Sequence, residues 1–330
     1  MLNYEIYIND EEVTQHILNF DYSENLDDVA SSFSFDSLID FGITSTNNNQ
    51  TRANIVRICE SGQTITRYLG IITDTEHTSD INKYHYSGFD IGFYLNKNKV
   101  IIQFKKANIG DAIKKLCEEY QINFEKSPNF TQTVSKIYKN IIFADVVKEL
   151  LQLEKDKGGL KNYYIDCKGG NFAIERYTYN QNLGSVIANN ILVDSFRTIN
   201  NVKVTHSFQD LKNRVIYSDN NEKSLKRVTR ENTNSIATYG LLTEIETVDT
   251  NKQNNLSKLA EDKLNELNKI KDTISLSMLG DYNIKKGVVI PLNINDYDLH
   301  GTYLIKSCSH SLDDKKEVVS IEVEKHDINT

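Results

Sequence analysis

The chain has 330 residues, which is enough for two or three domains. Its 2 Pro and 15 Gly argue against a disordered or collagen-like protein, and its Tyr and Phe residues, 9% of the chain, suffice for packed cores. The net charge of −8 gives no general attraction to DNA or to anionic membranes, which counts against a sequence-specific nucleic-acid-binding protein.

The N-terminal residues 1–8 contain no basic region followed by a long apolar core, so we expect no signal peptide. No unbroken apolar run in the sequence approaches the length needed to span a bilayer, so we expect no membrane partner. The four cysteines, Cys59, Cys117, Cys167 and Cys308, could form disulfides. Without a signal peptide, however, we expect four reduced thiols and synthesis in a bacterial cytoplasm.

Residues 1–104 have the pattern of a first small β-barrel domain. The segment 31–38 alternates polar and apolar residues over a full strand length, so Phe33 and Phe35 should share one face. Other short alternating runs predict strands at 4–8, 54–59, 64–69, 70–75 and 83–87. Many short strands with regular turns and little helix are typical of a small barrel or sandwich.

Residues 105–185 change to a helical period and predict an α/β insert domain. Asn108 can cap a first helix, whose apolar face would be Ile109, Ala112, Ile113, Leu116 and Tyr120. A second helix should end at Lys157-Gly-Gly159 and bury Val146, Val147, Leu150 and Leu151. After it, Lys168-Gly-Gly170 between two alternating segments indicates a β-hairpin over 162–176.

Residues 186–330 return to a β pattern and predict a second β domain. It should contain one long amphipathic helix, 252–272, with apolar residues three and four positions apart. Strands are predicted on both sides of this helix, at 201–206, 214–217, 288–292, 300–310 and 317–324. The whole chain therefore reads as a β-rich α+β protein.

The order of elements in this last domain resembles the late control D and XkdQ-like tail hub families of contractile phage tails and tailocins. A Tyr-Gly element, a long helix, a Gly-containing loop, a strand with Gly-x-Tyr-x-Ile and a His before the final hairpin follow one another there. The matching residues here are Tyr239, Gly240, Gly280, Ile284, Gly287, Gly301, Tyr303, Ile305 and His310. The sequence departs from the pattern at Tyr282, where the families usually have Pro.

This resemblance implies two tube-like barrels with the insert between them, and a structural role in a virion baseplate. Three copies would form a pseudo-sixfold ring that adapts a sixfold tail tube to a threefold central spike. The implied partners are other copies of the chain, the spike, the tail tube or tube-initiator protein, and baseplate wedge proteins. Neither enzyme activity nor a cofactor is implied.

The residues themselves predict no catalytic, cofactor-binding or metal site. The seven His are scattered singly, without the spacing of a zinc hydrolase. His310 could act as a base or could pack under the last hairpin, and the sequence indicates no partner carboxylate for it. The alternative function, a tail-associated cell-wall hydrolase or carbohydrate-binding module, would need paired acids or metal ligands that the sequence does not offer.

One compact basic cluster lies between residues 223 and 230. Its cations could face an acidic partner subunit, or they could form a solvated strand face. The candidate interface residues are Lys223, Lys226, Arg227 and Arg230.

Overall fold

The computed structural model describes residues 4–42, 55–60, 66–78, 83–184, 202–219, 227–248, 256–280, 283–313 and 317–326. The contacts between residues divide the chain into two units. The first unit comprises residues 1–202 and 275–330, and the second comprises residues 203–274. The predicted division at residues 104 and 185 stays a prediction.

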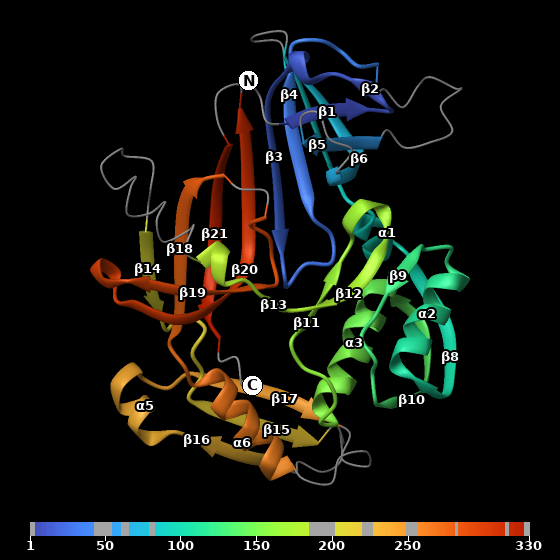
Figure 1. The fold of residues 1–330 in the computed structure, drawn as a ribbon. Helices are drawn as coiled ribbons and strands as arrows, with labels where there is room; N and C mark the ends of the chain where they lie inside the picture. Colours follow the sequence, from blue (N-terminus) through green and yellow to red (C-terminus); the bar gives the residue numbers. More distant parts are fainter. Residues whose placement is uncertain are drawn as a thin grey trace. The chain divides into compact units, whose positions relative to one another are not determined.

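The first unit is built on one long sheet that joins the two ends of the chain (Figure 1). Strand β3 (Ile17–Asn25) lies antiparallel to β20 (Leu299–Asp313), and Tyr22 stands directly opposite His310. The sheet order is β18 (Lys271–Leu279), β21 (Glu317–Lys325), β20, β3, β4 (Ser32–Ser37), β7 (Lys83–Phe89), β6 (Thr66–Thr78), β5 (Ile55–Glu60), β1 (Tyr4–Ile8) and β2 (Glu11–Glu12). Strand β19 (Val288–Ile294) also pairs with β20, and β13 (Thr178–Tyr179) pairs with β19.

This strand order corrects part of the predicted architecture. The β-rich character with few helices is confirmed, but within the described ranges no strand pairing closes the path into a barrel. The two predicted barrels are therefore not confirmed. Strand β6 is also longer than expected, because the segments predicted as two strands, 64–69 and 70–75, run on as one strand from Thr66 to Thr78.

The core beneath the N-terminal strands confirms the predicted alternation. Phe33 and Phe35 are both buried on the same face of β4. The ring of Phe20, from β3, stacks on each of them at 5.6 Å. Aromatic rings of this size bury much apolar area, which fixes the register of these two strands.

The segment predicted as the insert has helices packed on strands, and its first strand begins at Lys99, before the predicted boundary at 105, so the insert as a domain stays a prediction. Helix α2 (Ile109–Glu119) begins at Asn108, whose side chain accepts a hydrogen bond from the Gly110 N–H at 2.9 Å. Helix α3 (Phe143–Asp156) buries the four predicted apolar residues and ends before Gly158, which has φ of 76°. The strands of the insert are β8 (Lys99–Asn108), β10 (Thr133–Ile142), β9 (Phe124–Lys126), β11 (Tyr163–Asp166) and β12 (Phe172–Arg176), and a short helix α1 (Gly92–Lys97) precedes them.

The second unit contains a small sheet with a helix packed on it. Its strand order is β16 (Arg227–Glu231), β15 (Arg214–Asp219) and β17 (Thr243–Val248). Helix α6 (Leu256–Leu267) buries Ala260 and Leu264 against Val215 and Tyr217 of β15. Two further elements are strand β14 (Val202–Ser207) and helix α5 (Thr233–Tyr239).

The long helix predicted over 252–272 is wrong at its C-terminal end. Helix α6 stops at Leu267, and β18 already begins at Lys271. The reason is a change of period, since Ile274, Leu276 and Met278 are buried at every second position, as in a strand. Residues 252–255 lie outside the described residues.

Candidate functional site

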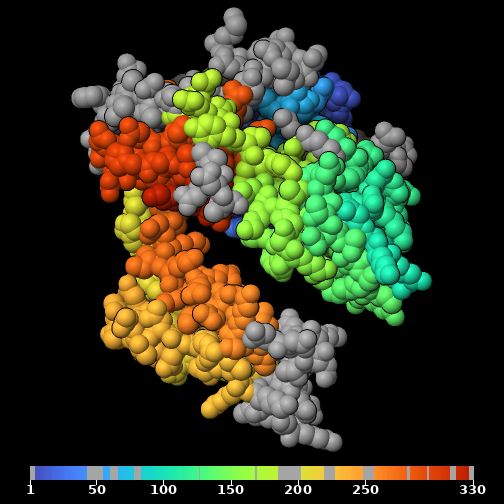
Figure 2. Space-filling view, turned by 60° about the horizontal axis from the view of Figure 1, so that its bottom comes forward, coloured from blue at the N-terminus to red at the C-terminus, as the bar shows by residue number. Residues whose placement is uncertain are grey.

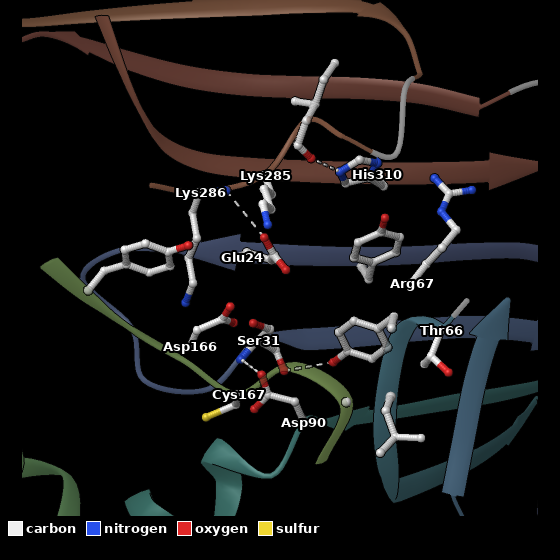
Figure 3. Close-up of a pocket in the computed structure, with 16 residues that line it drawn as sticks. Glu24, Ser31, Thr66, Arg67, Asp90, Asp166, Cys167, Lys285, Lys286 and His310 are labelled. Atoms are coloured by element: carbon white, nitrogen blue, oxygen red, sulfur yellow. Dashed lines mark hydrogen bonds between the residues drawn. The ribbon is translucent and has the colours of Figure 1, made fainter. Parts of the chain in front are cut away.

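A buried ionic network in the first unit connects three strands of the sheet, and Figure 3 shows two of its members, Arg67 and His310. Nη2 of Arg67, on β6, lies 2.6 Å from Oε1 of Glu317, on β21. The same carboxylate oxygen lies 2.8 Å from Nδ1 of His310, on β20. The side chains of His310 and Arg67 are 1% and 3% exposed, so this ion pair and its histidine are shielded from solvent.

The imidazole of His310 contacts its neighbours through both ring nitrogens and through one face of the ring. Its Nε2 lies 2.8 Å from the carbonyl oxygen of Ile284, and its ring stacks on Tyr22 with centroids 4.5 Å apart. Both ring nitrogens therefore face oxygen acceptors. Since a neutral imidazole has only one N–H, the ring donates both hydrogen bonds only when it is doubly protonated. This arrangement supports the packing role of His310 rather than a role as a base.

The pKa of Glu317 reflects these neighbours. Burial acts to raise its pKa, but the hydrogen bond from His310 and the positive charge of Arg67 outweigh burial and hold the pKa below its ordinary value. Glu317 therefore stays ionised beside the Arg67 guanidinium.

A second group of polar side chains stands across a small cavity from this network (Figure 3). Asp90 accepts hydrogen bonds from the backbone N–H groups of Ser31, at 3.0 Å, and Gly92, at 2.8 Å. Burial nevertheless raises the pKa of Asp90 to about 7, against the opposing effect of these donors. The Nζ of Lys286, which is also buried, donates to the carbonyl oxygen of Asn25 at 3.2 Å.

The cavity has a volume of about 80 Å³ and is lined by charged groups that include Glu24, Asp166 and Lys286. A water molecule occupies about 30 Å³ in the liquid, whereas ligand pockets usually exceed about 300 Å³. The cavity is therefore of a size for a few water molecules and too small for a sugar or a peptide.

Two of the residues singled out in the sequence, Gly280 and His310, contact Glu317. A third, Gly287, lies against Tyr164, which lines the cavity. A Cβ on Gly280 would lie 2.1 Å from Cγ of Glu317, and the Gly280 N–H donates to the Glu317 carbonyl oxygen at 2.8 Å. Gly287 has φ of 78°, and a Cβ there would lie 2.3 Å from the ring of Tyr164. Both positions therefore need glycine, because the chain passes too close to its neighbours for any side chain.

Comparisons with known proteins identify the family of the chain. A family model described as YQBQ-like matches residues 20–324. The chain belongs to the YQBQ-like family. Two relatives from Bacillus subtilis (strain 168) are similar to it over 74% of this chain and 74% of their own length. They are the uncharacterized protein YqbQ, 23% identical, and the phage-like element PBSX protein XkdQ, 20% identical.

Solved structures share the fold of this YQBQ-like chain over 98% of its length. The 43 kDa tail protein of prophage MuSo2 from Shewanella oneidensis has a TM-score of 0.67 at 11% identity, with 98% of that chain covered. The tail protein from Neisseria meningitidis MC58 has a TM-score of 0.68 at 12% identity, with 97% covered. The E. coli c3393 protein, a type VI secretion system component, has a TM-score of 0.55 at 13% identity, with 77% covered. The fold is thus that of phage tail proteins.

The other sequence-predicted residues lie away from the network. Gly301, with φ of 126°, and the buried Tyr303 are on β20, near its start. Tyr239 ends helix α5, and Gly240 follows it with φ of 79°, in the second unit. Their structural role in the YQBQ-like fold stays a prediction.

The basic cluster is described only in part. Arg227 and Arg230 lie on β16 in the second unit, and the Arg230 guanidinium donates to the hydroxyl of Ser257. Lys223 and Lys226 lie outside the described residues. The predicted interface role of these four cations stays a prediction.

Sequence reasoning missed the carboxylate partner of His310. Glu317 lies only seven residues further on, across the hairpin of β20 and β21. Because His310 pairs with Val319 in that hairpin, a glutamate two residues before Val319 is a diagonal neighbour of the imidazole. The hairpin register could have revealed this contact, whereas Arg67 is 250 residues away from Glu317 and left no local signal.

Two further features concern metals and membranes. In the described ranges, no group of three or more His, Cys, Asp or Glu side chains is arranged to hold a metal ion. None of the helices found in those ranges is both long enough and apolar enough to cross a membrane.

Proposed function

We propose that this protein is the hub of a baseplate in a contractile phage tail or a tailocin. Three copies would form a pseudo-sixfold ring between the sixfold tail tube and the threefold central spike. Each copy would contribute two β domains, residues 1–104 and 186–330, and one insert, residues 105–185. A trimer with two similar β domains per chain offers six near-equivalent surfaces, which is the physical basis of such a symmetry adaptor.

The observation that carries this proposal is the fold similarity to tail proteins over nearly the whole chain, insert included. A further support is the similarity to the c3393 protein, which is described as structurally similar to the T4 bacteriophage tail proteins gp27 and gp5. In this proposal the chain is made in a bacterial cytoplasm and assembled there with the spike, the tube or tube-initiator protein and the wedge proteins.

One face of the sheet is suited to the bore of such a ring. Five serines stand side by side on five neighbouring strands, in the order Ser277, Ser320, Ser309, Ser23 and Ser32. Hydroxyls of neighbouring strands hydrogen-bond at 2.8 Å between β18 and β21 and at 2.9 Å between β3 and β4. Short neutral side chains have little attraction for phosphates, so DNA could pass such a face without being retained.

Light scattering tests the proposal. We would measure the mass of the purified protein alone and with the spike and tube proteins encoded beside it. The expected result is a mass of three times 37.8 kDa, either alone or when captured by the spike. A monomeric mass, both alone and in the presence of the two partners, would refute the hub proposal. Peptidoglycan hydrolysis or glycan binding would then be assayed as the alternative function.

A further inference from the structure

The insert has a two-stranded sheet with one uncovered face. Strands β8 and β10 pair antiparallel, and helices α2 and α3 pack on one side of them (Figure 1). Ile102, Phe104 and Tyr138 are buried on that side. On the other side Ile101 is 67% exposed and Ile137 is 51% exposed. A solvated sheet face normally carries polar side chains, so two exposed isoleucines at its centre need another explanation.

The same face is basic, in contrast to the rest of the chain. Strands β8 and β10 contain five Lys and no Asp or Glu. Lys136 stands opposite the buried Phe104, so not all five lie on this face. The hollow on this face is lined by Lys105, Lys115, Lys139 and Glu119, a net charge of +2, which leaves −10 on the remainder of a chain of net charge −8. Lys136 pairs with Glu149, but Lys105 and Lys139 have no acidic partner among the residues that the structure describes.

These side chains surround a shallow hollow of about 670 Å³. Lys139 stands directly opposite Ile101 in the strand register, and Gln103 stands opposite Ile137. From α2, Lys115 and Glu119 complete the rim. The surface of the insert is coloured teal to green in Figure 2. We call the following residues the insert face: Ile101, Gln103, Lys105, Lys115, Glu119, Ile137 and Lys139.

The edges of this sheet are poorly suited to bind another strand. The pairing of β8 with β10 has irregularities between Val134 and Lys136 and between Lys139 and Ile141. The backbone N–H of Ile101 is not available to a further strand, since it donates to the hydroxyl of Tyr120 at 3.0 Å. Irregular, lysine-bearing edges of this kind resist strand addition. Contact with a partner would therefore go through the face.

We propose that the insert face docks on an acidic surface of a second copy of this chain. The charge complementarity lies within the sequence, since an insert face of net charge +2 meets a remainder of −10. The exposed isoleucines supply an apolar centre and the lysines a charged rim, the usual anatomy of a protein interface. This inference deepens the proposed function, because it takes from it that copies of the chain assemble around one axis.

The test compares the mass of full-length variants by light scattering over a range of concentrations and at low and high salt. The variants are Ile101→Asp and Ile137→Asp in the apolar centre and Lys139→Glu in the rim. Ile55→Asp is the matched control, because Ile55 is 43% exposed but lies outside the insert. Circular dichroism and thermal unfolding should match wild type for each variant, since all four positions are exposed.

We expect each variant of the insert face to need a concentration about tenfold or more above that of wild type for assembly, and Ile55→Asp to behave as wild type. High salt should weaken wild-type assembly and have less effect on Lys139→Glu. A wild-type trimer that persists in both Asp variants would overturn the insert face and leave the hub intact. An equal loss of assembly in Ile55→Asp would also overturn the insert face. The same holds if a variant of the insert face stays trimeric but no longer binds the tube protein. A monomeric mass for the wild-type protein, with and without the spike protein, would refute both proposals.

Discussion

Arg67→Met should destabilise the first unit by removing one partner of a buried ion pair. Arg67 and Glu317 have side chains that are 3% and 14% exposed, and the charged atoms are 2.6 Å apart. Removing one member of a buried pair costs about 3–5 kcal/mol, because the other charge stays buried. His310 still contacts Glu317, so we expect the lower end, about 3 kcal/mol, or a fall in Tm of about 6–12 °C.

The matched control is Arg57→Met. Its guanidinium contacts Asp10 at 3.3 Å, with the two side chains 32% and 92% exposed. A pair this accessible contributes about 0–1 kcal/mol. The chain has no Trp, so urea unfolding would be followed by circular dichroism. If Arg67→Met costs no more than Arg57→Met, the buried pair does not stabilise the fold as argued.

The cost of Arg67→Met should also depend on pH. The folded-state pKa of Glu317 is lowered, so this group contributes stability above its ordinary pKa of 4.5, and that stability is lost as pH falls through the lowered value. In Arg67→Met the part of this pKa lowering that Arg67 causes disappears. The difference between wild type and variant should therefore be largest at neutral pH and should shrink below about pH 4.5. A constant difference from pH 7 to pH 3 would contradict this assignment.

Three further changes test other parts of the fold. The pKa of Asp90 is raised to about 7, so wild-type stability should fall as pH rises from about 4 to about 7, and Asp90→Asn should remove that part of the slope in urea titrations. Gly287→Ala should lower Tm well below that of Gly158→Ala, because both glycines have positive φ but a Cβ meets another atom within 4 Å only at Gly287. Leu264→Ala should cost about 2–4 kcal/mol and speed hydrogen exchange in β15–β17, while exchange in the insert stays at the wild-type rate.

Local sequence signals predicted the two helices α2 and α3 well, since helices depend on contacts close in the chain. The Asn108 cap acts two residues away, and the buried positions of α2 and α3 follow the helical period. The single strand β6 was harder to predict, because Gly70 within it reads as a turn. In the structure Gly70 is packed under the Phe33 ring, where a Cβ would come within 2.6 Å. That close approach is a long-range requirement invisible to local patterns.

The pairing of β3 with β20 shows the limit most clearly. It joins residues near 22 to residues near 310, and neither strand carries a sequence motif that indicates its pairing partner. The same is true of the candidate site, whose His310 was singled out while Arg67 was not. The register of the final hairpin is local and could be predicted, whereas the position of β6 depends on the whole sheet.

The buried charges of Arg67 and Glu317 raise the question of why apolar side chains do not occupy these positions. Apolar residues of similar volume often stabilise as well as a buried ion pair. Our hypothesis is that the pair is present here because it favours one strand register. We therefore expect Arg67→Met combined with Glu317→Leu to recover most of the stability lost in Arg67→Met alone. His310 would keep its contact with Ile284, since its Nε2 lies 2.8 Å from that carbonyl oxygen.

The recovered stability should come with a less well defined sheet. Without the pair, β21 loses its charge contact to β6, and His310 of β20 loses its contact with Glu317. Hydrogen exchange in β20 and β21 should accelerate in the double variant even where its free energy of unfolding approaches that of wild type. If amide protection in these strands matches wild type at equal stability, the ion pair is not needed for register. If the double variant is instead no more stable than Arg67→Met, the cost arises from lost packing around Arg67 rather than from an unpaired buried charge.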